Sequence, residues 1–161
     1  MHDFQKDVLY QSENYIANPK ITTMTPLYNG EEFVQGLLDS FEQQTIFDEI
    51  EIIIVDSNSS DNSHSLILDF LRRHNNVSYI KTSFRENVCE AMNRILSIAR
   101  GEYIACAMVD DRHRPDALEK MVAVLDNHPD IALVYANSYY SNVKNDTFTA
   151  TKATEVRLWP K

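Results

Sequence analysis

Hydrophobic residues in this chain follow two periodicities that alternate from segment to segment, and this alternation restricts the possible fold more than any other feature. Apolar and β-branched runs of strand length occupy residues 21–25, 50–55, 77–81, 103–109 and 131–135. Between these runs, apolar residues recur at helical spacing, starting from Phe33, Leu66, Val88 and Ala117. Such alternation predicts an α/β domain with a mostly parallel sheet and helices on both faces.

The length of the chain favours a single domain. A chain of 161 residues can bury one substantial core but has no room for two large ones. We expect an N-terminal extension over residues 1–19, the α/β domain over 20–140, and an incomplete C-terminal segment over 141–161, where periodicity is lost. Pro115 suits the first turn of the helix that follows it, because the N–H groups of a first turn have no intrahelical partner.

Charge and composition exclude several partners and locations. The formal net charge of −9 argues against general binding to nucleic acid or to anionic membranes. The N-terminus has no secretory pattern, and no apolar run reaches the roughly 18 residues of a membrane span. We therefore expect a cytoplasmic location, with peripheral attachment to a membrane left open. Cys89 and Cys106 lack metal-ligand spacing and disulfide density, and each lies in an apolar periodic segment, which predicts two reduced, buried thiols in a cytosolic protein.

Three polar stretches lie where predicted strands end, at the edge where open α/β sheets bind ligands. They read TPLYNGEE (residues 25–32), DSNSSDNS (56–63) and VDDRHRPD (109–116). Residues 57–60 are typical of a turn and helix cap. Asp56 ends an apolar strand, so it either directs acceptor oxygens into the crevice or caps the turn.

Basic side chains near this edge have two possible roles. Arg112, His113 and Arg114 can contact a diphosphate or an acceptor, or they can form a solvated rim, which we favour. Arg85, just before the third predicted helix, can reach phosphates or stay on the surface. Because the chain as a whole is acidic, an anionic ligand would need such local positive charge.

These motifs, in this order and spacing, resemble the nucleotide-sugar-binding half of a family 2 glycosyltransferase with the GT-A fold. The resemblance covers about residues 20–140 and rests on ITTMTPLYNGEEFVQGLLDSFEQQTIFDEIEIIIVDSNSSDNS, ENVCEAMNRILSIARGEYIA and VDDRHRPDALEKMVAVLDNHPDIALVYAN. Each motif alone is a weak signal, whereas their shared order is specific. No glycine-rich dinucleotide fingerprint or phosphate loop competes with it, since the chain has only three glycines.

The resemblance implies roles for individual residues. The segment that matches the family's base pocket contains Thr25, Pro26, Tyr28 and Asn29, and the Tyr28 ring would stack on the base. Asp56 matches the acid that pairs with the base edge or the ribose. Asp110 and Asp111 match an aspartate-rich motif for Mn²⁺ or Mg²⁺, which bridges to the donor diphosphate, and Asp110 would also lie beside the nucleotide.

Three positions depart from the pattern of the family, and one of them is Asn87, which stands where a glycine is common in the entry loop of the third predicted helix. Many relatives carry Asp-x-Asp-Asp, whereas this chain has Met108 at the position of the first Asp, followed by Val109, Asp110 and Asp111. Ser57 stands where a second Asp often follows the acid that matches Asp56. These differences bear on metal affinity and on the choice of nucleotide more than on the fold.

The implied activity is transfer of a sugar from a nucleoside-diphosphate-sugar donor, with inversion and with help from a metal ion. A UDP-type donor is favoured over guanosine or thymidine types, and polysaccharide biosynthesis is the expected context. The acceptor stays open among saccharide, lipid-linked and protein classes.

The catalytic base of the family lies beyond this half. After Asp130 the only acids are Asp146 and Glu155, neither in a recognisable motif, so we name no base and expect the GT-A domain to be truncated at the C-terminus. One alternative is therefore a non-catalytic nucleotide-sugar-binding domain, or a donor-half fragment that needs a missing segment or a partner for turnover. Another doubly wound nucleotide binder is a weaker alternative, against which the Asp pair argues.

Overall fold

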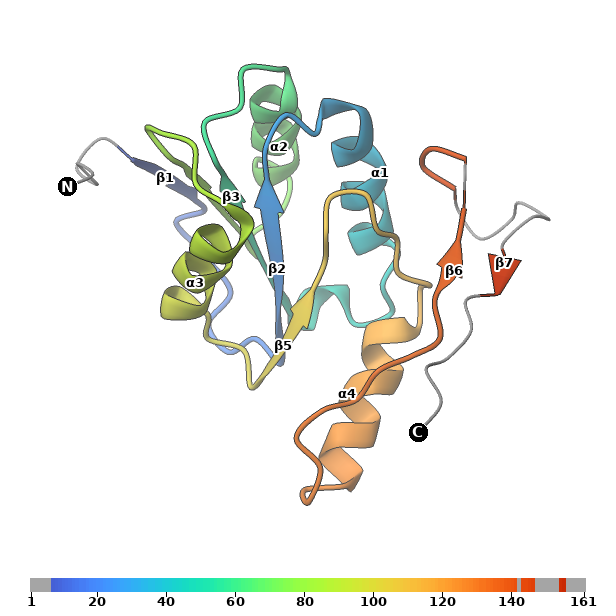
Figure 1. Cartoon of the computed structure of the whole chain (residues 1–161). Helices are drawn as coiled ribbons and strands as arrows, with labels where there is room; N and C mark the ends of the chain where they lie inside the picture. Colours follow the sequence, from blue (N-terminus) through green and yellow to red (C-terminus); the bar gives the residue numbers. More distant parts are fainter. Residues whose placement is uncertain (1–6, 142, 147–153, 156–161) are drawn as a thin grey trace.

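The computed structural model describes residues 7–141, 143–146 and 154–155 and has a five-stranded sheet at its centre (Figure 1). Four of the strands run parallel to one another: β2 (Ile21–Leu27), β3 (Ile50–Asp56), β4 (Val77–Lys81) and β5 (Tyr103–Cys106). The antiparallel edge strand β1 (Val8–Gln11) pairs with β4, which gives the order β1-β4-β3-β2-β5. The predicted α/β class with a mostly parallel, Rossmann-like sheet is confirmed.

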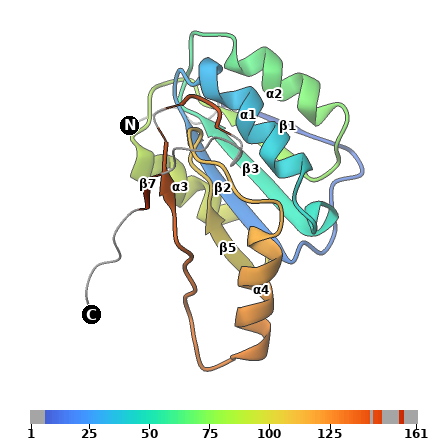
Figure 2. The same cartoon turned by 90° about the vertical axis from the view of Figure 1, so that its right-hand side faces the viewer.

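Helices cover both faces of this sheet (Figure 2). α1 (Glu31–Glu42) and α2 (Ser63–Leu71) lie on one face, and α3 (Val88–Ile98) lies on the other. α4 (Ala117–Asn127) joins the core on the α1 side through Leu118 and Val122. A 3-10 turn, η2 (Phe47–Glu49), leads into β3, and β6 (Tyr139–Tyr140) pairs with β7 (Thr154–Glu155) in a separate ribbon. Within the described ranges, no helix combines the length and the apolar character needed to cross a bilayer.

Strand β3 is buried along its whole length because both of its faces carry apolar side chains. Ile52 and Ile54 belong to the cluster that α1 and α2 cover, together with Phe70. Ile53 belongs to the cluster that α3 covers, together with Ile95. Burial on two sides is typical of a central parallel strand, and it explains why residues 50–55 form a continuous apolar run.

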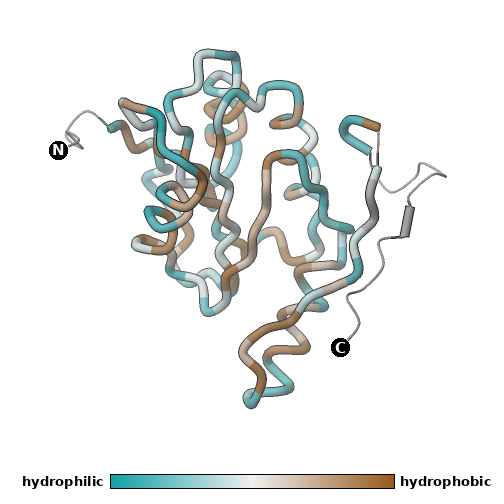
Figure 3. Tube along the Cα trace, viewed as in Figure 1, coloured by the Kyte–Doolittle hydropathy of each residue, from teal (hydrophilic) through white to brown (hydrophobic). Residues whose placement is uncertain are grey.

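The strand predicted over residues 131–135 does not form. Residues 131–138 follow α4 without being part of a sheet, and Figure 3 shows their hydrophobic stretch next to that helix. Leu133 is 79% exposed and Tyr135 is 75% exposed. An apolar run becomes a strand only where a neighbour supplies ladder hydrogen bonds, and no strand in the described part of the chain lies beside this one in a sheet.

Helix α4 starts later than Pro115 suggests. Asp116 is at the N-cap and Ala117 is the first helical residue, so Pro115 precedes the helix and does not belong to its first turn. The Pro115 carbonyl instead accepts a hydrogen bond at 2.9 Å from the N–H of Thr45, beyond the end of α1. The proline therefore joins the loop after β5 to the loop after α1.

Both cysteines are free, but the prediction that they are buried is wrong. Cys89 lies on the exposed side of the first turn of α3. Cys106 is the last residue of the edge strand β5, where exposure alternates so that Ile104 and Cys106 are exposed. Periodicity alone did not distinguish a covered strand face from an uncovered one.

Candidate functional site

The carboxyl ends of β2, β3 and β4 meet in register at one edge of the sheet. Leu27 pairs with Asp56, and Asp56 pairs with Lys81, so the loops that follow these strands begin side by side. β5 ends before it reaches this edge, because its last residue, Cys106, pairs with Met24 and not with Leu27. The loop that follows β5 then continues toward the same edge. The three polar stretches identified in the sequence therefore follow neighbouring strands.

An open cavity of about 710 Å³ lies at this edge. Its volume falls within the range of roughly 300–1,000 Å³ that is usual for small-molecule sites. The lining comes from the end of β2, the start of the loop after β3, the start of α3 with the loop before it, and the loop after β5; it includes Pro26, Tyr28, Ser57, Arg85, Asn87 and Met108. Pro26 and Tyr28 thus line the cavity, whereas Thr25, Asn29 and Asp56 do not line it.

Tyr28 presents its ring to this cavity and does not lie in the core. The residue is 42% exposed, and the guanidinium carbon of Arg85 lies 4.0 Å from the centroid of the ring. A partly exposed aromatic ring at the wall of a cavity is suited to stacking on a planar base. The sequence analysis identified Tyr28 and Arg85 as separate candidates and did not predict the contact between them.

Pro26 explains why β5 ends at Cys106 and not at Val109, where the sequence had placed its end. The N–H of Ala107 donates to the Met24 carbonyl, so the alternation along β2 also directs the Pro26 nitrogen toward β5. Pro26 has no N–H to donate, and the hydroxyl of Thr25 bonds the Ala107 carbonyl at 2.8 Å instead. The ladder stops there, and the next residues are free to form the loop that carries the acids.

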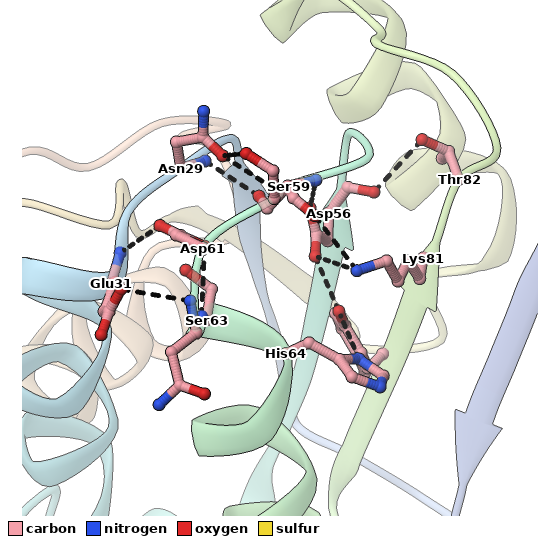
Figure 4. A network of polar contacts seen from close by, with 12 residues as sticks. Asn29, Glu31, Asp56, Ser59, Asp61, Ser63, His64, Lys81 and Thr82 are labelled. Carbon is pink, nitrogen blue, oxygen red and sulfur yellow. Dashed lines mark hydrogen bonds and ion pairs between the residues drawn. The ribbon is translucent and has the colours of Figure 1, made fainter.

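Asn29 ties the loop after β2 to the loop after β3 (Figure 4). Its N–H donates to Ser59 Oγ at 2.9 Å, and its Oδ1 accepts from the N–H of Ser60 at 2.9 Å. Asn29 has φ 48°, in the left-handed region that asparagine tolerates better than most residues. It therefore shapes the edge of the cavity from behind the lining residues.

A second pair of contacts joins the starts of α1 and α2 (Figure 4). The N–H of Glu31 donates to Asp61 Oδ2 at 2.9 Å, and the N–H of Asn62 donates to Glu31 Oε2 at 3.1 Å. Burial alone would raise the pKa of Asp61, but hydrogen bonds from Glu31 and Ser63 outweigh it and hold the pKa below its usual value. Asp61 therefore stays ionised and helps to fix both helix N-termini.

Asp56 is fully buried, and both of its carboxyl oxygens have partners (Figure 4). Oδ1 accepts from the N–H of Ser59 at 2.7 Å, and Oδ2 accepts from the Tyr79 hydroxyl at 2.7 Å. Lys81 Nζ lies 3.9 Å from Oδ2 and donates to the Ser59 carbonyl at 3.2 Å. This geometry is that of a carboxylate that holds the 57–60 turn, as in the capping alternative of the sequence analysis.

Tyr79→Phe is expected to lower the free energy of unfolding by about 1–3 kcal/mol, because the buried Asp56 carboxylate loses a hydroxyl donor. Urea unfolding followed by circular dichroism measures the difference. Tyr10→Phe is the matched control, since the Tyr10 ring stacks on Tyr79 at 5.5 Å while its hydroxyl is not a donor to Asp56. Equal stabilities of the two variants would show that Ser59 and Lys81 suffice to hold the carboxylate.

Asp110 and Asp111 lie on the loop after β5, just beyond the cavity-lining Met108. Both residues are exposed, and among the described residues neither carboxylate accepts a hydrogen bond or forms an ion pair. Partial burial of the carboxyl and, second, the charge of Asp110 raise the pKa of Asp111. Like charges on adjacent side chains repel each other, and a bound cation would reverse that repulsion.

Arg112 and His113 do not form the solvated rim that we favoured for them. Arg112 donates to the carbonyls of Val109 at 3.0 Å and of Phe33 at 2.7 Å, and to Asn145 Oδ1. Burial lowers the pKa of Arg112 and of His113. Arg114 is the exposed one, and its Nε pairs with Asp116 Oδ1 at 2.5 Å. Arg112 thus anchors the acidic loop to the first turn of α1.

The loop before α3 is fixed by local hydrogen bonds. Asn87 caps the helix by accepting from the N–H of Glu90 at 3.0 Å, while Glu90 accepts from the N–H of Asn87 at 2.8 Å. Glu86, which also lines the cavity, bonds Arg94 Nε at 3.1 Å. The Asn87-x-x-Glu90 spacing is a capping-box signature, so this boundary was readable in the sequence, although its place beside the cavity was not.

Proteins of similar sequence are described as glycosyltransferases. The sequence profile described as "Glycosyl transferase family 2" matches residues 22–160. The putative glycosyltransferase EpsH of Bacillus subtilis is 30% identical over 118 residues, which cover 73% of this chain and 34% of EpsH. An uncharacterized glycosyltransferase of Methanocaldococcus jannaschii is 27% identical over 123 residues, or 76% of this chain and 42% of that protein. The chain thus spans less than half the length of these relatives.

Solved structures show the same fold. TarS 1-349 of S. aureus in complex with UDP has a TM-score of 0.64 and 25% identity, covering 68% of this chain and 33% of that chain. The mannosyltransferase PcManGT of Pyrobaculum calidifontis, in complex with GDP-Man and Mn²⁺, has a TM-score of 0.62 and 24% identity, covering 76% of this chain and 36% of that chain. The matched profile and the fold shared with these structures lead to one conclusion. The chain belongs to glycosyl transferase family 2, with a GT-A fold.

Proposed function

We propose that this domain binds a nucleoside-diphosphate sugar in the 710 Å³ cavity and takes part in transfer of the sugar to an acceptor with inversion. One observation carries the proposal: an exposed tyrosine ring, a cationic side chain and two unpaired carboxylates lie around the carboxyl edge of one sheet. These groups are a stacking surface for a base, a countercharge for a diphosphate and oxygen ligands for a divalent cation.

We assign the base to the wall formed by Tyr28 and Pro26, with a UDP-type donor preferred. The preference is supported by TarS, whose solved complex contains UDP and which is 25% identical to this chain. Three predicted residues would support the site without lining the cavity: Thr25, Asn29 and Asp56. Their hydrogen bonds fix the backbone of the surrounding loops. Asp110, near the cavity-lining Met108, completes the nucleotide side of the site.

Asp111 and Asp110 are the residues that would hold Mn²⁺ or Mg²⁺. Among the described residues, no group of three or more His, Cys, Asp or Glu side chains gathers to hold a metal ion. The two carboxylates still fit the role, because neither has a partner in the described part of the chain and these cations also take oxygen ligands from diphosphate and water. When bound, such an ion neutralises charge on the leaving diphosphate.

The acceptor side of the reaction is assigned only by class. We propose a saccharide, lipid-linked or protein acceptor and a role in polysaccharide biosynthesis, at a cytoplasmic or peripheral membrane location. No base is assigned: the Asp146 carboxylate accepts a hydrogen bond from the Ser141 hydroxyl at 2.6 Å, and the side chain of Glu155 lies outside the described structure. Because the chain spans 42% and 34% of two relatives, donor binding without turnover is the second candidate.

Tyr28→Ala is expected to weaken binding of UDP at least about tenfold, because stacking on an aromatic ring is worth about 1–3 kcal/mol per base. Isothermal titration calorimetry in the presence of Mn²⁺ measures the affinity. Tyr28→Phe should retain most of it, since the ring is kept. Tyr135→Ala removes an equally large side chain that is 75% exposed and serves as the matched control. UDP binding that is unaffected by Tyr28→Ala would place the base elsewhere.

A further inference from the structure

Arg85 is the only Lys or Arg among the described residues that line the cavity. Two acids, Glu86 and Glu90, also line it, but both already have partners. Glu86 bonds Arg94, and Glu90 accepts from the backbone N–H of Asn87. The net charge of the chain is −9, so a diphosphate in this cavity finds its positive protein charge mainly in Arg85.

The guanidinium of Arg85 is held by the Tyr28 ring and not by an acid. Its carbon lies 4.0 Å from the ring centroid, which is a close cation–π contact. Arg85 is exposed, and the described part of the chain shows no ion pair or hydrogen bond to its side chain. The contact is therefore weak enough to be exchanged for a better partner, such as a phosphate oxygen.

A base and this guanidinium cannot occupy the same face of Tyr28. Each packs against the ring at van der Waals distance, and Arg85 already has that place at 4.0 Å. Both residues line the same cavity, so a base that stacks on the ring face held by Arg85 must displace the Arg85 side chain. A nucleoside alone must displace Arg85 without offering it a new partner, whereas a nucleoside diphosphate brings phosphate oxygens with it.

We infer that Arg85 is a specificity residue that selects nucleoside diphosphates over nucleosides by exchanging the Tyr28 ring for the diphosphate. The inference rests on the proposed function, and it names Arg85 as the side chain that determines which class of ligand binds. In the unliganded chain, Arg85 covers Tyr28 and competes with any base. In the complex, it leaves the ring and donates hydrogen bonds to the phosphates, while the base stacks where the guanidinium had been.

The inference predicts effects of opposite sign for two ligands that share one base. In Arg85→Ala, the affinity for uridine should rise about two- to fivefold, which corresponds to the loss of a cation–π contact of about 0.5–1 kcal/mol. The affinity for UDP should fall at least about tenfold, because a charge-assisted hydrogen bond is lost. Arg85→Lys should lie between the wild type and Arg85→Ala for UDP, because the charge is kept without the planar fork.

Calorimetric titration of the 161-residue chain with uridine and with UDP, each with Mn²⁺, tests the inference. Arg72→Ala is the control for loss of one positive charge, since Arg72 lies at the other end of α2 and pairs with Asp69. If the wild type binds UDP but Arg85→Ala binds uridine no more tightly than the wild type does, the exchange is overturned and the proposed function stands. Failure of the wild type to bind either UDP or GDP would overturn both.

Discussion

Asp111→Asn is expected to abolish the manganese-dependent part of nucleotide binding by this chain. The variant loses one of the two adjacent carboxylates on the loop after β5, and among the described residues no third acid gathers with them to hold a metal ion. Replacing a group that only hydrogen-bonds to a metal ligand commonly costs about 10–100-fold in metal affinity, so loss of a direct ligand should cost at least about 100-fold. Titrations of UDP with Mn²⁺ and with EDTA give the dependence for both proteins.

Stability provides the control for this prediction. The pKa of Asp111 is raised in the folded chain, so folding favours the protonated carboxyl, and the ionised carboxyl destabilises the fold once the pH exceeds its unfolded pKa. Without metal at neutral pH, Asp111→Asn should therefore be as stable as the wild type or more stable. Asp116→Asn, on the same loop, should leave manganese dependence unchanged. An unchanged response to Mn²⁺ in Asp111→Asn would rule out the metal role, whereas a destabilised variant would contradict only the stability argument.

The 161-residue chain alone is expected to bind donor and metal but to transfer sugar poorly. The proposed site would hold the donor, whereas among the described residues no carboxylate is assigned as the base that would deprotonate an acceptor. General-base help is typically worth about 10²–10⁴ in rate, and that factor would be lost. Slow, metal-dependent hydrolysis of UDP-sugars, measured by release of UDP, is the activity that we expect from the purified chain.

Two variants decide whether the base is present after all. Asp146→Asn and Glu155→Gln remove the only acids after Asp130. If the chain transfers sugar efficiently and one of these variants loses at least about 100-fold in rate without losing UDP affinity, that residue is the base. In that case the second candidate function, donor binding without turnover, is wrong.

The strands and helices of the domain could be read from the sequence because local periodicity reports burial directly. The apolar run of residues 50–55 became β3, which is buried on both faces, and the helical stripe from Val88 became α3. The same reasoning failed for residues 131–135, because a strand also needs a neighbour, and periodicity says nothing about neighbours. It also missed β1, whose four residues VLYQ pair with β4.

The candidate site was only partly readable. Strand order is not written in local sequence, yet it decides that the loops after β2, β3 and β4 start side by side. Asp56 was identified as an acid at a strand end, but its burial under Tyr79 and Ser59 follows from the packing of β4 against β3. Arg112 was expected on the rim, whereas it bonds the carbonyl of Phe33 from α1.

The sequence by itself determined the α/β class, the order of its motifs and the residue types at the strand ends, because these depend on neighbours along the chain. Only the tertiary structure decided which of those residues meet. It brought Arg85 onto the ring of Tyr28, 57 positions earlier in the chain, and it gave Asp110 and Asp111 no partner among the described residues. Contacts of this kind depend on the pairing register of parallel strands and on the paths of loops, which no local pattern specifies.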